Sequence, residues 1–422
     1  MSFKFIHAAD IHLDSPLAGL ERYEGAPVDQ VRAATRRALT NLVNVAIAER
    51  VAFVLIAGDL YDGDWRDYST GLFFVREMSR LREADILVLI IAGNHDAQSQ
   101  ITKALRLPEN VRLLSEEGPE TVIDERRGVV IHGQSFARRV VTDDLSVRYP
   151  VPLQDLFNIG LLHTSADGRE GHEPYAPCRP DALVAKGYQY WALGHVHKRE
   201  ILHEDPWVLF CGNLQGRSVR ETDAKGCTLV AVEGGQVQGV EHRDIDVVRW
   251  ALCDVDASGA EDGDALLDRL SAALAERISH ADGRVLGVRV RIVGPCKAHR
   301  ELVTNPERWR NEIRARATDL SAGNAWVEKI EFDTSPDQGV EDLSAREDAV
   351  GGLLRAIEDL PWDAELLGAL ASEWAELKRR LPGGAVEGAD GLALGAQDWL
   401  PRVLPAVKAM LVSRLLGRGG EA

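Results

Sequence analysis

The sequence predicts an α/β protein with a large N-terminal domain, a smaller α/β domain and a helical C-terminal region. Apolar runs typical of buried strands alternate with amphipathic helical stretches over residues 1–243. A β-α-β-α-β pattern follows over residues 244–336, and strand signals are absent from residues 337–422. At 422 residues the chain is also too long for one ordinary hydrophobic core.

The bulk composition is that of a folded protein, with 45% hydrophobic and 27% charged residues. The formal net charge of −17 argues against a broad, non-specific grip on nucleic-acid phosphates. Any contact with nucleic acid should therefore be local, assisted by metal ions, or shared with a partner subunit.

The five cysteines are odd in number and lack CxxC spacing, which favours free thiols over disulfides or a zinc ribbon. The N-terminus runs directly into a predicted strand, unlike a signal peptide, and no apolar run approaches the length of a membrane span. We therefore expect a cytoplasmic protein that does not insert into a membrane.

The first domain begins with strand-like runs that are apolar enough to be buried on both faces. Five such runs lie at residues 3–8, 52–57, 86–92, 159–162 and 190–193. Helical spacing of apolar residues predicts helices over residues 31–46 and about 69–83. Two more strands, at residues 207–211 and 228–232, are joined by the loop 212–226. Together these elements predict a mixed sheet arrangement with outer helices.

The second domain is predicted to contain three strands and two helices. The strands lie at residues 250–255, 285–293 and 325–332, and the helices at residues 265–278 and 306–320. Further helices are predicted at residues 344–359 and 363–381, followed by a glycine-rich linker over residues 382–395. The apolar stripe over residues 399–411 is either a face buried in its own domain or a docking helix for a partner.

Each of the five apolar runs in the first domain ends in polar side chains. These candidate ligands are Asp10, His12, Asp59, Asn94, His163, His195 and His197. Polar groups at the ends of neighbouring strands gather at one edge of an α/β sheet. Carboxylate, amide and imidazole are the donors that a pair of borderline divalent metals prefers. Any one of these residues could be structural, but the whole ordered set predicts a two-metal site.

The spacing suggests how the ligands are shared. Asp10 and His12 are one residue apart, as are His195 and His197, so in an extended chain each pair faces one side. Asp59 is the natural bridge, because its two oxygens can touch two cations. Two ions about 3.5–4 Å apart would hold a shared hydroxide and clamp a phosphate for in-line attack. Imidazole-rich ligation favours manganese, iron or zinc, with magnesium as the alternative.

Two further residues are candidate catalytic groups. His95 follows the expected ligand Asn94, and we expect it to protonate a leaving oxygen or to stabilise developing charge. Asp62 lies three residues beyond Asp59 and is predicted to orient His95 and to keep it protonated.

Three residues are candidate substrate contacts. Trp65 lies in a polar loop and would either stack on a nucleic-acid end or pack against the site. Arg217 and Arg220 would either hold a substrate phosphate or pair on the surface with Glu221 or Asp223.

In order and spacing, these clusters resemble the calcineurin-like metallophosphoesterase superfamily. Residues 5–16, 163–172 and 212–217 narrow the resemblance to the bacterial YhaO-type, SbcD-like DNA-repair exonucleases. The resemblance is strong over about residues 1–235. It implies a β-sandwich core flanked by helices, a small α/β domain that caps the site, and manganese-dependent cleavage of DNA.

The resemblance also implies how the metals are held. One ion would be bound by Asp10, His12, Asp59 and His197, and the second by Asp59, Asn94, His163 and His195. Such nucleases work with coiled-coil ATPases, so an SbcC-like subunit is an expected partner of the C-terminal helices, with DNA as substrate and a homodimer as a further expectation.

The leading functional hypothesis is a two-metal DNA exonuclease in DNA repair, which hydrolyses phosphodiesters with a metal-bound hydroxide. The alternative is a phosphomonoesterase or a phosphodiesterase for small molecules or cyclic nucleotides. A third hypothesis is a non-catalytic scaffold that binds DNA ends or an ATPase. The complete ligand set argues against the scaffold, because a degenerate site should have lost at least one donor.

Overall fold

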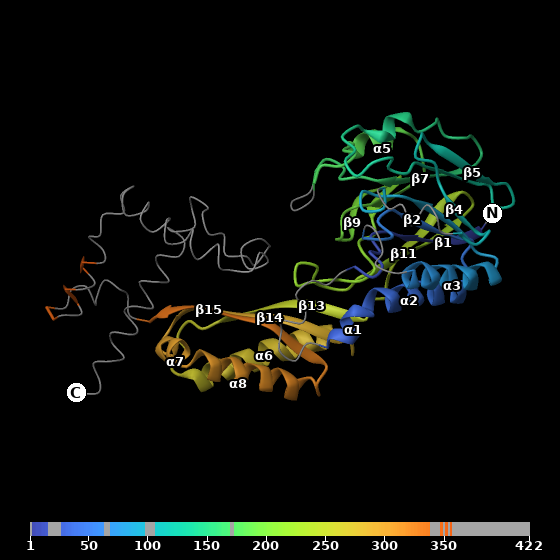
Figure 1. The fold of residues 1–422 in the computed structure, drawn as a ribbon. Helices are drawn as coiled ribbons and strands as arrows, with labels where there is room; N and C mark the ends of the chain where they lie inside the picture. The colour runs from blue at the N-terminus through green and yellow to red at the C-terminus, as the bar shows by residue number, and fades with distance from the viewer. Residues whose placement is uncertain are drawn as a thin grey trace. The chain divides into compact units, whose positions relative to one another are not determined.

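The computed structural model describes residues 2–15, 27–62, 68–97, 106–168 and 173–337, with residues 347, 348, 351, 352, 355 and 356 (Figure 1). It divides into two compact units. The first comprises Met1–Leu252, Arg277–Arg289 and Ser321–Lys329, and the second comprises Cys253–Glu276, Val290–Leu320 and Ile330–Ala422. The three-domain division at residues 243 and 336 stays a prediction. The predicted helix at 363–381, the linker and the stripe at 399–411 lie outside the described residues, as does most of the predicted helix at 344–359.

The first unit is built on two six-stranded mixed sheets. The strands of the first sheet are β1 (Ser2–Ala8), β2 (Phe53–Ala57), β3 (Leu87–Ile91), β4 (Val111–Leu113), β11 (Gly226–Glu233) and β12 (Gln236–Asp244), in the order β12-β11-β1-β2-β3-β4. The strands of the second are β5 (Glu120–Asp124), β6 (Val129–Gly133), β7 (Phe157–His163), β8 (Tyr190–Gly194), β9 (Glu200–Glu204) and β10 (Trp207–Phe210), in the order β5-β6-β7-β8-β10-β9.

The strands that carry the candidate ligands run parallel within each sheet. In the first sheet, Phe5 of β1 pairs with Phe53 of β2, which pairs with Leu87 of β3. In the second sheet, β7 and β8 are likewise parallel. The carboxyl ends of β1, β2 and β3 therefore lie together, and so do those of β7 and β8.

The two sheets pack face to face around an apolar layer. Phe5 lies between them, with its ring centroid 5.1 Å from that of Phe53 in its own sheet and 5.1 Å from that of Tyr190 in the other. Leu89 and Ile159 belong to the same buried layer. This is the predicted sandwich, and burial of its large apolar side chains is a principal source of its stability.

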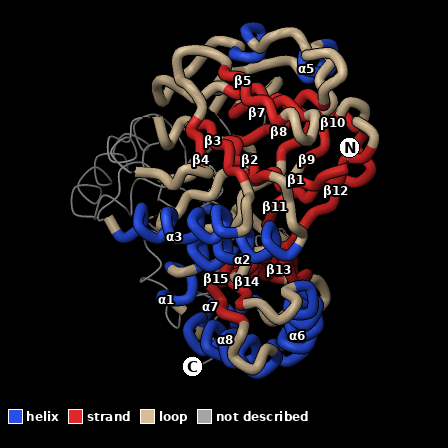
Figure 2. Tube along the Cα trace, turned by 90° about the vertical axis from the view of Figure 1, so that its right-hand side faces the viewer, coloured by secondary structure: helices blue, strands red, loops and turns tan. Residues whose placement is uncertain are grey.

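Helices cover the outer faces of the sandwich (Figures 1 and 2). The helices α2 (Ala34–Ala48) and α3 (Ser69–Glu83) pack on the first sheet through residues such as Leu42 and Phe74. On the second sheet, α5 (Pro180–Ala185) packs beside Trp191, and a 3-10 helix spans Leu145–Arg148. The helix predicted over 31–46 starts earlier, as α1 (Val28–Arg32), and is interrupted at Ala33 before α2.

A second α/β assembly follows. The strands β13 (Val248–Asp256), β14 (Val285–Cys296) and β15 (Ala325–Pro336) form a three-stranded sheet in that order, and the helices are α6 (Gly263–His280), α7 (His299–Thr304) and α8 (Pro306–Leu320). Within the second unit, α6 and α8 lie along one face of the sheet (Figure 1). The predicted strands and helices are observed in the predicted order, with one addition, because the short helix α7 precedes α8. Within the described part of the chain, we find no helix both long and apolar enough to cross a bilayer.

Candidate metal centre

The seven predicted metal ligands are gathered at the carboxyl ends of the parallel strands. Asp10 follows β1, Asp59 follows β2 and Asn94 follows β3. From the second sheet, His163 is the last residue of β7 and His195 follows β8. All five of these side chains are buried, so the donors meet between the two sheets rather than on the open surface.

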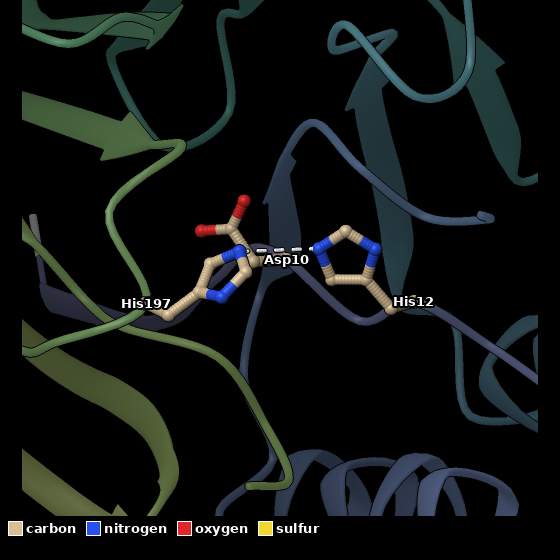
Figure 3. Close-up of side chains that lie close together, drawn as sticks. All are labelled: Asp10, His12 and His197. Carbon is tan, nitrogen blue, oxygen red and sulfur yellow. Dashed lines mark hydrogen bonds between the residues drawn. The ribbon is translucent and has the colours of Figure 1, made fainter. Parts of the chain in front are cut away.

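The donor atoms of the candidate ligands form two groups, and the Asp59 carboxylate lies close to both. In the first group, candidate ligand atoms of Asp10, His12 and His197 all lie within 4.8 Å of one another. Figure 3 shows these three side chains close together, with the Nε2 atoms of His12 and His197 3.2 Å apart. In the second group, Asp59, His163 and His195 meet the same distance limit of 4.8 Å.

Asp59 and Asn94 complete the arrangement. The Oδ2 atom of Asp59 lies 3.9 Å from Nε2 of His12 in the first group and 3.6 Å from Nε2 of His163 in the second. The Oδ1 atom of Asn94 is 3.0 Å from the same His163 nitrogen. One carboxylate thus faces both groups, which is the geometry required of a bridging ligand.

The predicted extended geometry of the paired ligands is wrong. Asp10 has φ 50°, His12 has φ 44° and His195 has φ 101°, all in the region that side-chain-bearing residues seldom adopt. The reason is hydrogen bonding between loops, because the backbone N–H groups of Asp10 and His12 donate to the carbonyls of Gly58 and Asp59, both at 3.0 Å. The first two ligand loops therefore run side by side.

Two glycines permit the close approach of these loops. Gly58 has φ 93°, and a Cβ atom there would overlap the imidazole of His163. A Cβ atom at Gly93 would overlap the carboxylate of Asp59. The ligand groups can therefore meet only because both positions lack a side chain.

Asp96, which the sequence pattern did not identify as part of the site, holds two loops of candidate ligands together. Its buried carboxylate accepts hydrogen bonds from the backbone N–H groups of Leu60 (3.0 Å), Tyr61 (2.8 Å) and Gly93 (3.2 Å). Burial and the nearby charge of Asp59 raise the pKa of Asp96 to about 7. This carboxylate fixes the loop after β2 against the loop after β3.

His95 and Asp62 are brought together beside the first group. The Nδ1 atom of His95 lies 2.6 Å from Oδ1 of Asp62, whose other oxygen accepts a hydrogen bond from the Ser15 hydroxyl at 2.7 Å. Asp62 raises the pKa of His95, which favours the imidazolium form. The imidazoles of His12, at 3.8 Å, and of His95 in turn lower the pKa of Asp62. The His95 side chain is 33% exposed, so it remains accessible to a ligand.

Glu221 is a second residue that the sequence reasoning missed as part of the site. Its Oε1 atom lies 2.7 Å from Nδ1 of His197, so this carboxylate orients a candidate ligand through its other ring nitrogen. Although burial favours the neutral acid, His197 and Arg217 lower the pKa of Glu221. Sequence reasoning considered Glu221 only as an ion-pair partner for arginine.

The predicted substrate contacts differ in their positions. Arg217 forms the ion pair considered as the alternative, with Nη2 3.0 Å from Oε1 of Glu221, and it also borders the site through Asp62. Arg220 has an exposed side chain in the same loop. Trp65 lies outside the described residues.

The donor set fits divalent cations. Among the described residues, neither Asp10 nor Asp59 has a lysine or arginine ion-pair partner, although both are buried. Burial, together with Asp59, raises the pKa of Asp10 well above its usual range. Burial also lowers the pKa of His12 to about 4 and lowers the pKa of His163, which favours the neutral imidazole that can donate a lone pair. Buried carboxylates beside neutral imidazoles are the chemistry of a metal site.

Comparison with known proteins agrees with this geometry. Residues 3–199 match the family model of the calcineurin-like phosphoesterases, and residues 250–335 match the model of the middle domain of metallophosphoesterase YhaO. The second match extends the resemblance beyond the sequence motifs, because it falls on the small α/β assembly.

Three curated relatives are similar over much of the chain. The uncharacterized metallophosphoesterase YhaO of Bacillus subtilis is 38% identical over 266 residues, which cover 62% of this chain and 65% of the relative. The DNA double-strand break repair protein Mre11 of Sulfurisphaera tokodaii is 26% identical over 58% of this chain and 63% of its own length. Mre11 of Halobacterium salinarum is 26% identical over 81% of both chains. The first two matches thus span slightly less than two thirds of the relatives.

Proposed function

Residues 3–199 belong to the calcineurin-like phosphoesterases, and from this we propose that the protein is a metal-dependent DNA exonuclease that acts in DNA repair. The observation that carries the proposal is the position of Asp59 between two groups of metal-binding side chains. Beside them lies a histidine–carboxylate pair suited to proton donation. A phosphodiester needs both kinds of group, because charge develops on the phosphate and on the leaving oxygen.

The proposed ligands are divided between two ions. Asp10, His12, Asp59 and His197 would hold the first, and Asp59, Asn94, His163 and His195 would hold the second. When bound, divalent cations supply Lewis-acid activation of water and offset the charge of the phosphate. The imidazole content favours manganese, with iron, zinc and magnesium as the ions to compare.

The role of the protein's own residues follows from their hydrogen bonds. Asp62 occupies Nδ1 of His95, so Nε2 is the ring nitrogen left to donate a proton to the departing oxygen. Ser15 holds the second oxygen of Asp62 and so fixes the carboxylate that orients His95. Glu221 orients His197 in the same manner on the other side of the first group.

DNA as the substrate is supported by the relatives rather than by the site alone. Two of the relatives above are DNA double-strand break repair proteins, and the similarity in one of them covers 81% of both chains. An ATPase partner for residues 337–422, a homodimer and a cytoplasmic location, which were expected from the sequence, are further proposals. Arg220, in the loop beside Arg217, is retained as a proposed phosphate contact, as is Trp65.

The experiment offers the purified protein end-labelled double- and single-stranded DNA, a cyclic nucleotide and p-nitrophenyl phosphate. Each substrate is tested with manganese, magnesium, zinc or a chelator. The proposal expects stepwise shortening of DNA that requires the metal and is abolished by Asp59→Asn. The variant His203→Gln, at an exposed histidine bonded to the Pro206 carbonyl, should behave as wild type. Turnover of the small esters alone would contradict a nuclease.

A further inference from the structure

Arg217 lies between the candidate metal ligands and the candidate proton donor. Its Nη2 atom is 3.3 Å from Nδ1 of His197, a ligand of the first group. Its Nη1 atom is 3.8 Å from Oδ2 of Asp62, whose other oxygen holds His95 at 2.6 Å. The guanidinium therefore borders the metal ligands on one side and the proton donor on the other.

The two edges of this guanidinium are used unequally. Nη2 and Nε face the carboxylate of Glu221 at 3.0 and 3.4 Å, and the backbone N–H of Arg217 donates to Glu221 at 2.7 Å. In contrast, within the described ranges Nη1 makes one hydrogen bond, a long one of 3.5 Å to the Ser15 hydroxyl. The side chain keeps 21% of its surface exposed. One edge is thus anchored, while the other is available to an oxygen of a ligand.

The position of His95 indicates which part of the substrate carries the oxygen that Nη1 would bind. A proton donor stands on the side from which the leaving oxygen departs, and Arg217 shares Asp62 with it. Nη1 of Arg217 has only long contacts, at 3.5 Å to Ser15 and 3.8 Å to Asp62, and such an arginine edge can bind phosphate oxygens through directed, charge-assisted hydrogen bonds. Building on the nuclease proposed above, we propose that Arg217 is a specificity-determining residue that binds a second phosphate, carried by the departing group.

Binding of a second phosphate by Arg217 would make the site prefer a nucleic-acid chain. When a polynucleotide is cleaved, the departing nucleoside carries the next phosphate of the chain. A p-nitrophenyl group or an unphosphorylated nucleoside carries none, so Nη1 of Arg217 keeps only its long contacts with Ser15 and Asp62. The metal ligands would act on every one of these esters and His95 on those with a sugar leaving group, whereas Arg217 would distinguish the phosphorylated leaving groups from the others.

The test compares hydrolysis of the internal phosphodiester in three thymidine dinucleotides: unphosphorylated, 5′-phosphorylated and 3′-phosphorylated. With manganese, the wild-type protein should hydrolyse one phosphorylated form at least about tenfold faster than the unphosphorylated one. Arg217→Met should bring this ratio close to one. Arg217→Lys should give an intermediate ratio, because lysine keeps the charge but loses the planar fork.

The control is Arg127→Met, which removes an arginine that pairs with Asp124 at 2.6 Å in the turn between β5 and β6. It should keep the wild-type ratio. An equal loss on all three dinucleotides with the ratio unchanged, together with a fall in bound manganese, would reveal a purely structural role and overturn the assignment. No phosphate preference in the wild-type protein would also overturn it.

A fourth substrate, bis(p-nitrophenyl) phosphate, separates this failure from failure of the proposed function. If the wild-type protein hydrolyses that ester but neither DNA nor any dinucleotide, the nuclease proposal itself fails, and the role of Arg217 fails with it. If dinucleotides are cut without dependence on Arg217, only the role of Arg217 is lost.

Discussion

At His95, one carboxylate determines both the orientation of the ring and its charge. Asp62 lies 2.6 Å from Nδ1 and raises the pKa of the imidazole, so the proton on the opposite nitrogen is available to a leaving oxygen. A poor leaving group such as a sugar hydroxyl needs that proton, whereas p-nitrophenolate departs without it.

We therefore predict that His95→Gln lowers the rate on DNA by about 10²- to 10⁴-fold but lowers the rate on bis(p-nitrophenyl) phosphate far less. Steady-state rates on both substrates, with manganese saturating, measure the difference. His203→Gln is the matched control. Equal losses on the two substrates would show that His95 does not act as the proton donor.

Glu221 acts through His197, which is a different kind of role. Because its carboxylate holds Nδ1 of His197 at 2.7 Å, Glu221→Gln should weaken manganese binding by about 10- to 100-fold. The manganese concentration at half-maximal activity, together with calorimetric titration, reports the change, and excess manganese should restore the rate. Glu49→Gln removes a carboxylate that pairs with Lys4 and Arg243 elsewhere and should leave affinity unchanged. Unaltered affinity in Glu221→Gln would refute the positioning role.

Among the strands and helices, the site forms because the loops that follow the parallel strands pack directly against one another. Strands whose apolar runs are uninterrupted, such as β2 with its five buried residues, were predictable from the sequence. The edge strands β5, β9 and β12 were not predicted, because their exposed residues interrupt any apolar run. The candidate ligands could be chosen from the sequence because each one lies at the end of such a run, and their assignment to metal ions stays a prediction.

The local geometry of the ligands was not predictable in the same way. The positive φ angles of Asp10 and His12 depend on hydrogen bonds to a loop that lies far away in the sequence. The contact of Glu221 with His197 joins residues 24 apart through the fold. Asp96 follows His95 in the sequence, but the sequence does not show its three backbone partners. A pattern within one segment carries no information about such contacts.

Because the ligand loops pack so closely, the variant Gly93→Ala tests their arrangement. The new methyl group would overlap the Asp59 carboxylate, so we predict loss of most activity and of metal binding while the circular dichroism spectrum stays native. Gly118→Ala is the control, because a Cβ atom there meets nothing within 4 Å. Wild-type metal affinity in Gly93→Ala would mean that the loops do not approach as closely as described.

In the molecule as a whole, the candidate metal site buries two carboxylates, and their charge destabilises the fold unless cations bind beside them. Asp10 and Asp59 are buried together, and the described residues give them no lysine or arginine ion pair. Cations that bind only the folded state stabilise it by mass action, by about 2.7 kcal/mol at a concentration one hundred times the Kd.

Manganese should therefore raise the Tm of the wild-type protein by several degrees, as measured by calorimetry against a chelator-treated sample. Asp10→Asn should abolish most of this rise and should itself raise the Tm of the metal-free protein, because it removes a buried charge. A Tm that manganese leaves unchanged, or raises equally in Asp10→Asn, would contradict a cation site at these residues.

If Asp59 bridges two cations, anomalous scattering from a crystal grown with manganese should locate both ions. We predict two peaks about 3.5–4 Å apart. One should lie beside Asp10, His12 and His197, the other beside Asn94, His163 and His195, with Asp59 in contact with both. A single peak, or peaks away from Asp59, would show that Asp59 does not bridge two cations.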